Sequence, residues 1–251
     1  MEVIDSHTHW GPSVTMWGVT VTSQELLQQA RQSSVSRIVI MPFPSTAIAD
    51  ESINTQVLEE ARDNPLFIPY YYIPEDLRPI PEDNGFYGGK WHWTRGVQDY
   101  SSNYDVLEDP RLPAFIERSE EIDLPIIFEE DLAFTDQFIK KTKSLKIIIP
   151  HLGMLGGNPL DFLASFKNCP HVHFDTALGS TATIQKFVQT IGPERILFGS
   201  DIPFGTMKNE LEKVLELKIG EASQELILAG NLKRLIRLHD ISSPTAEAST
   251  L

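Results

Sequence analysis

Short apolar runs alternate with longer amphipathic stretches along the chain. Several of the runs, such as Ile38–Ile40 and Ile147–Ile149, are continuously apolar, which is typical of strands buried on both faces. The pattern predicts eight strands, at Val3–His7, Arg37–Met41, Leu66–Ile73, Phe86–His92, Pro125–Glu129, Leu145–Pro150, His171–Asp175 and Arg195–Gly199. Helical periodicity predicts helices at Ser23–Ser33, Glu51–Asn64, Pro110–Ile122, Thr135–Lys143, Pro159–Asn168, Thr181–Ile191, Met207–Leu217 and Ala222–Leu238.

This alternation predicts an α/β protein with a (β/α)8 TIM barrel. A doubly wound open sheet is the alternative, but no glycine-rich nucleotide fingerprint follows any expected strand. Three prolines between the third and fourth strands argue against a full helix there. We expect Ser23 and Asp136 to cap helices, residues 1–241 to form one barrel domain, and residues 242–251 to be a frayed tail.

Charge and cysteine content indicate the cellular compartment of the protein and argue against some classes of partner. The 251 residues carry 35 acidic and 21 basic side chains, a net charge of −14, which disfavours nucleic acid and anionic membranes as partners. Cys169 is the only cysteine, so no intrachain disulfide can form. No apolar run is long enough to span a bilayer, and the first expected strand leaves no room for a signal peptide. We therefore expect a cytoplasmic protein with a small-molecule substrate, and leave a homo-oligomer open.

The segment Ile4–Trp10 contains the first candidate chemistry. His7 and His9 are two residues apart at the end of an apolar run, so in a strand their imidazoles point to the same side. Two imidazoles placed this way can bind one metal ion, and Asp5 shares that face one layer deeper. The alternative is a pair of surface histidines near a terminus.

Polar side chains also collect at the ends of four other expected strands, and in a barrel these ends meet at one rim. They are Lys90 and His92 on strand four, Glu129 and Glu130 on strand five, His151 after strand six, and Asp201 after strand eight. Each alone would be read as a capping acid or a core histidine. Together they predict a site for a divalent metal, Zn²⁺ or the harder Mn²⁺.

The motifs resemble those of the amidohydrolase superfamily, and within it the amidohydrolase-2 group, which is similar to aminocarboxymuconate-semialdehyde decarboxylase. The matching stretches are Ile4–His9, Ile149–Gly153, Ile196–Pro203 and Ala229–Leu235. The resemblance implies a distorted barrel with one divalent metal held by His7, His9 and Asp201. It also implies that His151 contacts the metal-bound water or the substrate.

One departure from that family concerns Glu129. The family ends strand five with a metal-binding histidine, whereas here the stretch Leu124–Glu129 ends in a glutamate. We expect Glu129 to bind the metal as a hard ligand, which would favour Mn²⁺ over the Zn²⁺ otherwise expected. A site that has lost its metal is the alternative. We expect Glu130, on the opposite side of the strand, to cap or pack.

Other side chains near the rim are candidates for substrate contact. Lys90 either pairs with an acid such as Glu129 or, as in some superfamily members, is carboxylated and bridges two metals. His92 lies on the same face, nearer the rim. The aromatic residues near strand ends either seal loops or line a pocket for a planar or apolar substrate; they are Trp10, Trp17, Trp91, Trp93 and Phe204. Arg95 could hold a substrate carboxylate or neutralise a local acid.

Our main functional prediction is a metal-dependent hydrolase of a small amide, ester or lactone. In that mechanism Asp201 takes the proton from metal-bound water and passes it to the leaving group, and His151 orients the water or stabilises the oxyanion. The first alternative, also implied by the resemblance, is a lyase that decarboxylates a small unsaturated or aromatic acid. The second is a non-catalytic barrel in which Glu129 marks a decayed site.

Overall fold

The computed structural model describes residues 1–16, 18–82, 85–92 and 94–238. Within these residues eight parallel strands pair in the order β11, β10, β9, β8, β5, β4, β3, β1, and the short β2 (Thr20–Val21) pairs antiparallel with β1. Their bounds are β1 Ile4–Pro12, β3 Arg37–Pro42, β4 Phe67–Tyr72, β5 Gly88–Trp91, β8 Ile126–Phe128, β9 Ile147–Ile149, β10 Val172–Asp175 and β11 Ile196–Leu197. Each lies within or overlaps one of the expected strands.

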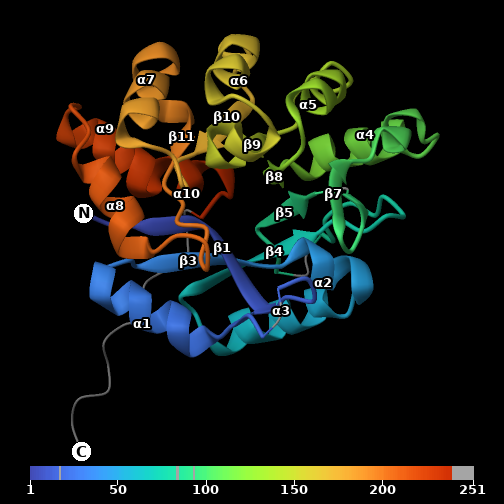
Figure 1. The fold of residues 1–251 in the computed structure, drawn as a ribbon, viewed down its shortest axis with the longest axis horizontal. Coiled ribbons are helices and arrows are strands. Elements are labelled where there is room, and N and C mark those ends of the chain that lie inside the picture. Colours follow the sequence, from blue (N-terminus) through green and yellow to red (C-terminus); the bar gives the residue numbers. More distant parts are fainter. Residues whose placement is uncertain (17, 83–84, 93, 239–251) are drawn as a thin grey trace, which may run out of the picture.

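Backbone hydrogen bonds join the two edges of this sheet. Ser6 N donates to Phe198 O at 2.9 Å, and Asp201 N donates to His7 O at 2.7 Å. These bonds link β1 to the segment that follows β11, so the sheet curls round into a ring with helices outside it (Figure 1). The predicted TIM-barrel fold is confirmed.

The helices follow the strands and cover the outside of the ring (Figure 1). They are α1 Ser23–Ser33, α2 Pro44–Ala49, α3 Ile53–Asp63, α4 Leu112–Ile122, α5 Leu132–Ile139, α6 Pro159–Phe166, α7 Thr181–Ile191, α8 Met207–Leu215, α9 Glu221–Glu225 and α10 Asn231–Leu235. A π-helical turn at Leu226–Gly230 joins α9 to α10, where the sequence predicted one continuous helix. The helix α2 and the hairpin of β6 (Thr94–Gly96) and β7 (Asp99–Ser102) were not predicted.

Both helix caps proposed from the sequence differ from those in the structure. Thr22 rather than Ser23 caps α1, in a capping box with Glu25, because its hydroxyl accepts the Glu25 backbone N–H. Asp131 rather than Asp136 caps α5 by accepting the Phe134 N–H, so this helix begins three residues earlier than expected.

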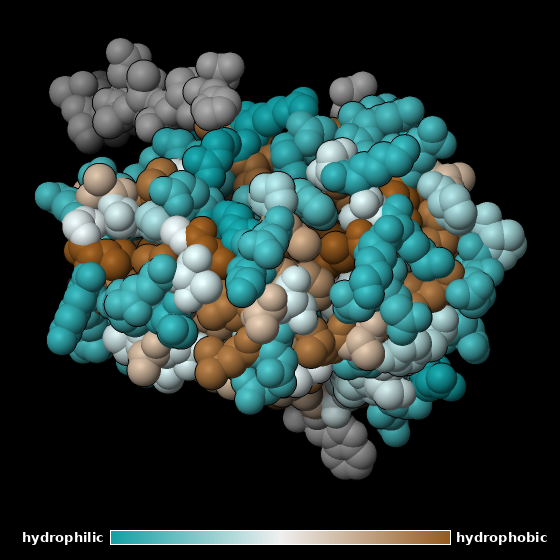
Figure 2. All heavy atoms as spheres, turned by 90° about the horizontal axis from the view of Figure 1, so that it is seen from above, coloured by the Kyte–Doolittle hydropathy of each residue, from teal (hydrophilic) through white to brown (hydrophobic). Residues whose placement is uncertain are grey.

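The two largest clusters of the apolar core lie on the inner and outer faces of the sheet. Alternate strand residues such as Val39, Ile68 and Ile148 fill the inside of the barrel, and residues of α10 close its lower end. The intervening residues, such as Ile38 and Ile147, pack outward against the helices. The face of the molecule seen in Figure 2 is mostly hydrophilic, with hydrophobic residues showing between the hydrophilic ones. Among the described residues, none of the helices combines the length and apolar character needed to cross a membrane.

Candidate metal centre and active-site pocket

Three buried side chains converge at the carboxyl end of the barrel. His7 and His9 extend from β1, and Asp201 follows β11 across the seam that closes the sheet. Asp201 Oδ1 lies 3.5 Å from His7 Nε2 and 3.2 Å from His9 Nε2. Asp5, one layer deeper, accepts the backbone N–H groups of His7 and Ser200 and so fixes the start of both segments.

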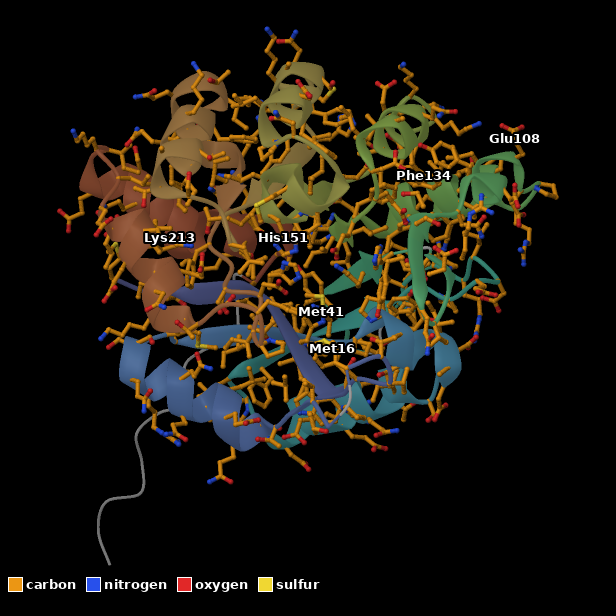
Figure 3. All side chains as sticks on the ribbon, viewed as in Figure 1. Met16, Met41, Glu108, Phe134, His151 and Lys213 are labelled. Atoms are coloured by element: carbon orange, nitrogen blue, oxygen red, sulfur yellow. The ribbon has the colours of Figure 1, made fainter. Side chains whose placement is uncertain are left out.

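His151 joins this cluster from the turn after β9. Its Nε2 lies 3.8 Å from Asp201 Oδ2 and 3.8 Å from Glu129 Oε1. Figure 3 shows His151 near the middle of the ring of strands, whereas Glu108 lies at the outer edge of the molecule. Both His151 and Asp201 have φ of 55°, a left-handed conformation that costs energy in residues with a Cβ atom. The backbone is thus held in a strained geometry at both residues that we proposed from sequence as catalytic.

Asp175, at the end of β10, orients one of the histidines. Its Oδ2 lies 2.8 Å from His7 Nδ1, and its Oδ1 accepts the backbone N–H groups of His151 and Ala177. With its proton on Nδ1, His7 presents the Nε2 lone pair to the centre, an arrangement common among metal-binding histidines. The sequence analysis missed Asp175, although a carboxylate at the end of the seventh strand was a usable signal.

The charges of the cluster depend on each other. Burial alone would lower the pKa of His7, but the carboxylates of Asp175 and Asp201 outweigh it and raise that pKa. Burial lowers the pKa of His9, and Asp201 only partly opposes this. Burial would raise the pKa of Asp201, yet the neighbouring histidines, His7 first, hold it below its usual value. Asp201 is therefore a carboxylate at neutral pH.

The donor set fits a divalent metal ion. His7 Nε2 and Asp201 Oδ1 are buried and make no hydrogen bond within the described part of the chain. Buried polar atoms without partners are costly, and a cation between them would satisfy both. A tetrahedral ion with bonds of about 2.0–2.2 Å separates its donors by roughly 3.3–3.6 Å, close to the 3.5 Å and 3.2 Å from Asp201 to the two histidines. His7, His9 and Asp201 could hold such an ion.

Glu129 stands apart from these three donors. Its Oε2 accepts a hydrogen bond from Lys90 Nζ, which reaches it from the neighbouring strand β5. Burial would raise the pKa of Glu129, but the ammonium of Lys90 and the nearby histidines hold it well below its usual range. The structure therefore shows the Lys90–Glu129 pair, and only Oε1 of Glu129 faces the cluster.

A cavity of about 770 Å³ opens over the cluster. Its walls include His9, Met16, Phe43, His92, Tyr100, Ser102, Glu129, Glu130, Asp131, His151, Leu155, Leu178, Asp201 and Phe204. Glu130 also accepts a hydrogen bond from the indole N–H of Trp91. The described residues that line the cavity include four acids but no lysine or arginine. An anionic substrate would therefore depend on the metal for its charge partner.

Aromatic rings and a hairpin shape this pocket. The His9 ring stacks on Phe43 with a centroid distance of 4.6 Å, and Phe204 meets it edge-on. His92 places Nδ1 2.6 Å from the carbonyl oxygen of Glu129, so Nδ1 carries the proton when the ring is neutral. Tyr100 of β7 stacks on His92 at 5.9 Å and its hydroxyl lies 2.7 Å from Thr15 Oγ1. The hairpin thus reaches across the pocket to the loop after β1.

Some candidates for substrate contact lie elsewhere. Trp10 is half-buried and donates its indole N–H to Ser23 Oγ, outside the pocket lining. Arg95 is exposed and also lies outside that lining. Lys90 is buried beneath the pocket, and His92 and Phe204 line it. Trp17, Trp93 and the tail at 242–251 fall outside the described residues.

Comparison with known protein families shows which family this chain belongs to. The family model described as amidohydrolase matches residues 73–238, well over half of the chain. The chain belongs to the amidohydrolase family. It is thus an enzyme of the family that its motifs resemble. A search of curated proteins found no match.

Solved structures similar to this amidohydrolase share its barrel at low sequence identity. The 2,6-dihydroxybenzoate decarboxylase from Rhizobium has a TM-score of 0.76 and 18% identity, covering 94% of this chain and 99% of the other. A dihydroxybenzoic acid decarboxylase from Polaromonas sp. JS666, with bound manganese and 2-nitroresorcinol, has a TM-score of 0.76 and 14% identity over 95% and 98%. The 5-carboxyvanillate decarboxylase from Sphingomonas paucimobilis has a TM-score of 0.74 and 13% identity over 94% and 99%.

Proposed function

We propose that this amidohydrolase is a metal-dependent decarboxylase of a small aromatic or unsaturated carboxylic acid. The observation that carries the proposal is the buried set of His7, His9 and Asp201 at the floor of a pocket with aromatic and aliphatic walls. Three similar structures are decarboxylases of aromatic acids, and one of them contains manganese. This favours the lyase alternative over the hydrolase that the sequence analysis put first.

The proposed chemistry needs a charge partner for the carboxylate and a proton donor. A divalent ion at the three donors would supply the positive charge that the pocket walls lack. The bond to the carboxyl carbon breaks, CO2 leaves, and the electron pair left on the substrate carbon takes up a proton. We assign this proton to His151, because its Nε2 faces the pocket beside Asp201 Oδ2.

The two oxygens of Asp201 have separate roles in this assignment. Oδ1 faces the two histidines of β1 and would bind the metal ion, whereas Oδ2 faces His151 and can exchange a proton with it. Phe43 holds the His9 ring in place by stacking, and Asp175 does so for His7 through Nδ1. Preorganised ligands of this kind keep the ion in one position during the reaction.

Hydrolysis of a neutral amide, ester or lactone is the second candidate. It is favoured by the four acidic side chains of the pocket and by the lack of lysine and arginine among the described lining residues. A neutral substrate would meet no repulsion from that lining, whereas a carboxylate would.

One assay separates the two candidates. Protein loaded with Mn²⁺ is incubated in D2O with 2,6-dihydroxybenzoate, 5-carboxyvanillate and a panel of aryl esters and lactones. We expect release of CO2 and deuterium at the carbon that lost it, and a loss of at least about 100-fold in His151→Gln. A matched control, His171→Gln, changes a half-buried histidine just before β10 and should keep full activity. Ester or lactone cleavage without CO2 release would instead establish the hydrolase.

A further inference from the structure

The Lys90–Glu129 pair occupies the floor of the pocket beside the proposed metal centre. The side chain of Lys90 is entirely buried, and that of Glu129 is 16% exposed, toward the pocket. Adjacent strands position the two residues: Lys90 is opposite Ile127 in the β5–β8 register, and Glu129 N donates to Trp91 O. Among the described residues, Glu129 is the one carboxylate within 4.0 Å of Lys90 Nζ.

This burial makes the pair hard to separate. An ammonium group without water or a carboxylate partner is strongly destabilised inside a protein. Lys90 therefore holds Oε2 of Glu129 where it is, and leaves only Oε1 on the side of His151. The two charges cancel, so the pair adds no net charge to the centre.

The donor geometry places Glu129 outside the metal set. Among the described residues, the potential ligand atoms of His7, His9 and Asp201 all lie within 4.8 Å of one another, and no such group includes Glu129. A bound divalent ion and Asp201 together would carry one net positive charge. Ligation by Glu129 as well would cancel that charge, and the described lining of the pocket contains no lysine or arginine to replace it.

We propose that Lys90 is a positioning residue that withholds Glu129 from the metal. The centre then consists of two histidines and one carboxylate, with open positions and a net positive charge for the substrate carboxylate. This inference rests on the proposed metal-dependent function. It also replaces the expectation, drawn from sequence, that Glu129 is itself a ligand.

Dissociation constants for Mn²⁺ and Zn²⁺, measured by competition with a chelator, test the proposal in Lys90→Met and in the double variant Lys90→Met with Glu129→Gln. The double variant removes a neutral pair and leaves no buried charge, so it should bind both ions within about threefold of wild type. Lys90→Met alone releases Glu129 and should bind at least about tenfold more tightly than the double variant, the scale on which groups around a metal act. Its Co²⁺ form should show weaker visible absorption, as expected when the coordination number rises.

Each contrary outcome has a distinct meaning. Loss of tenfold or more in metal affinity in the folded double variant would show that Glu129 is a ligand in wild type and overturn the proposal. Equal affinities of Lys90→Met and the double variant would also overturn it, because Glu129 would not have been released. If Lys90→Met fails to fold, the metal affinity of the double variant relative to wild type still tests the proposal, because a loss of tenfold or more would overturn it. Wild-type protein that binds neither ion would overturn the proposed function as well.

Discussion

The hydrogen bond between Asp175 and His7 gives a sharp test of how the centre is organised. In Asp175→Asn the amide oxygen can still accept the two hydrogen bonds that Oδ1 now accepts from the backbone N–H groups of His151 and Ala177. The amide NH2 then faces His7 Nδ1, which lies 2.8 Å from Oδ2 in the wild type. Because an NH2 group donates, His7 must accept at Nδ1 and carry its proton on Nε2. The lone pair that faces Asp201 is lost.

The magnitude follows from the metal chemistry. Removing the partner that fixes a ligating histidine costs about 10- to 100-fold in metal affinity. At about 1.4 kcal/mol per factor of ten this is roughly 1.4 to 2.8 kcal/mol of binding free energy. In the metal-free protein a hydrogen bond to a charged group becomes one between neutral groups, so the loss of unfolding free energy should stay below the roughly 1.5–3 kcal/mol of a charged hydrogen bond, and the variant should stay folded.

The assay is a chelator competition with Zn²⁺ and Mn²⁺ at a fixed pH, together with thermal unfolding of the metal-free proteins. The matched control is Asp161→Asn, at an exposed position on α6, which should bind metal as wild type does. If Asp175→Asn bound both ions within twofold of wild type, the argument that Asp175 sets the tautomer of His7 would be refuted.

Two further predictions concern stability. Burial raises the pKa of Asp5 to about 7, so between about pH 4 and 7 the folded protein binds a proton that the unfolded chain lacks, and the free energy of unfolding falls as pH rises. Asp5→Asn should remove up to about 4 kcal/mol of this loss. If the free energy of unfolding in urea fell equally with pH in both proteins, the prediction would be contradicted. Glu120 accepts the N–H groups of residues 143, 144 and 145, which outweigh burial and hold its pKa below the usual value. The stabilisation that the Glu120 carboxylate gives the folded protein is therefore present above about pH 4 and is lost as the pH falls further. Glu120→Ala should therefore cost about 1–3 kcal/mol at pH 7 without changing metal affinity, and an unchanged denaturation midpoint would disprove this role.

Much of the scaffold could be predicted because buried parallel strands are continuous apolar runs. The runs Ile38–Ile40 and Ile147–Ile149 lie within β3 and β9. The ends of such strands share one rim, so a location for His7, His9, His151 and Asp201 followed from the fold alone. The structure brings these four together, while their roles stay predictions.

The pocket walls could not be predicted in the same way. They come largely from loops and from the β6–β7 hairpin, whose short polar strands have no apolar periodicity. Trp10 was a candidate for the pocket because it lies near the end of a strand, but it lies outside the lining. The Lys90–Glu129 pair was one of two alternatives for Lys90, and only the strand register selects between them. Asp175 was missed, although it ends an expected strand, because its contact with His7 joins two strands that are not neighbours in the sheet.

The most direct test of the central claim is the position of a bound metal ion. Crystals grown with Mn²⁺ would be measured by anomalous diffraction. The account predicts one strong peak within about 2.0–2.3 Å of His7 Nε2, His9 Nε2 and Asp201 Oδ1, with Glu129 still bonded to Lys90. A map without a peak at these three atoms, or with the ion elsewhere in the barrel, would contradict the account.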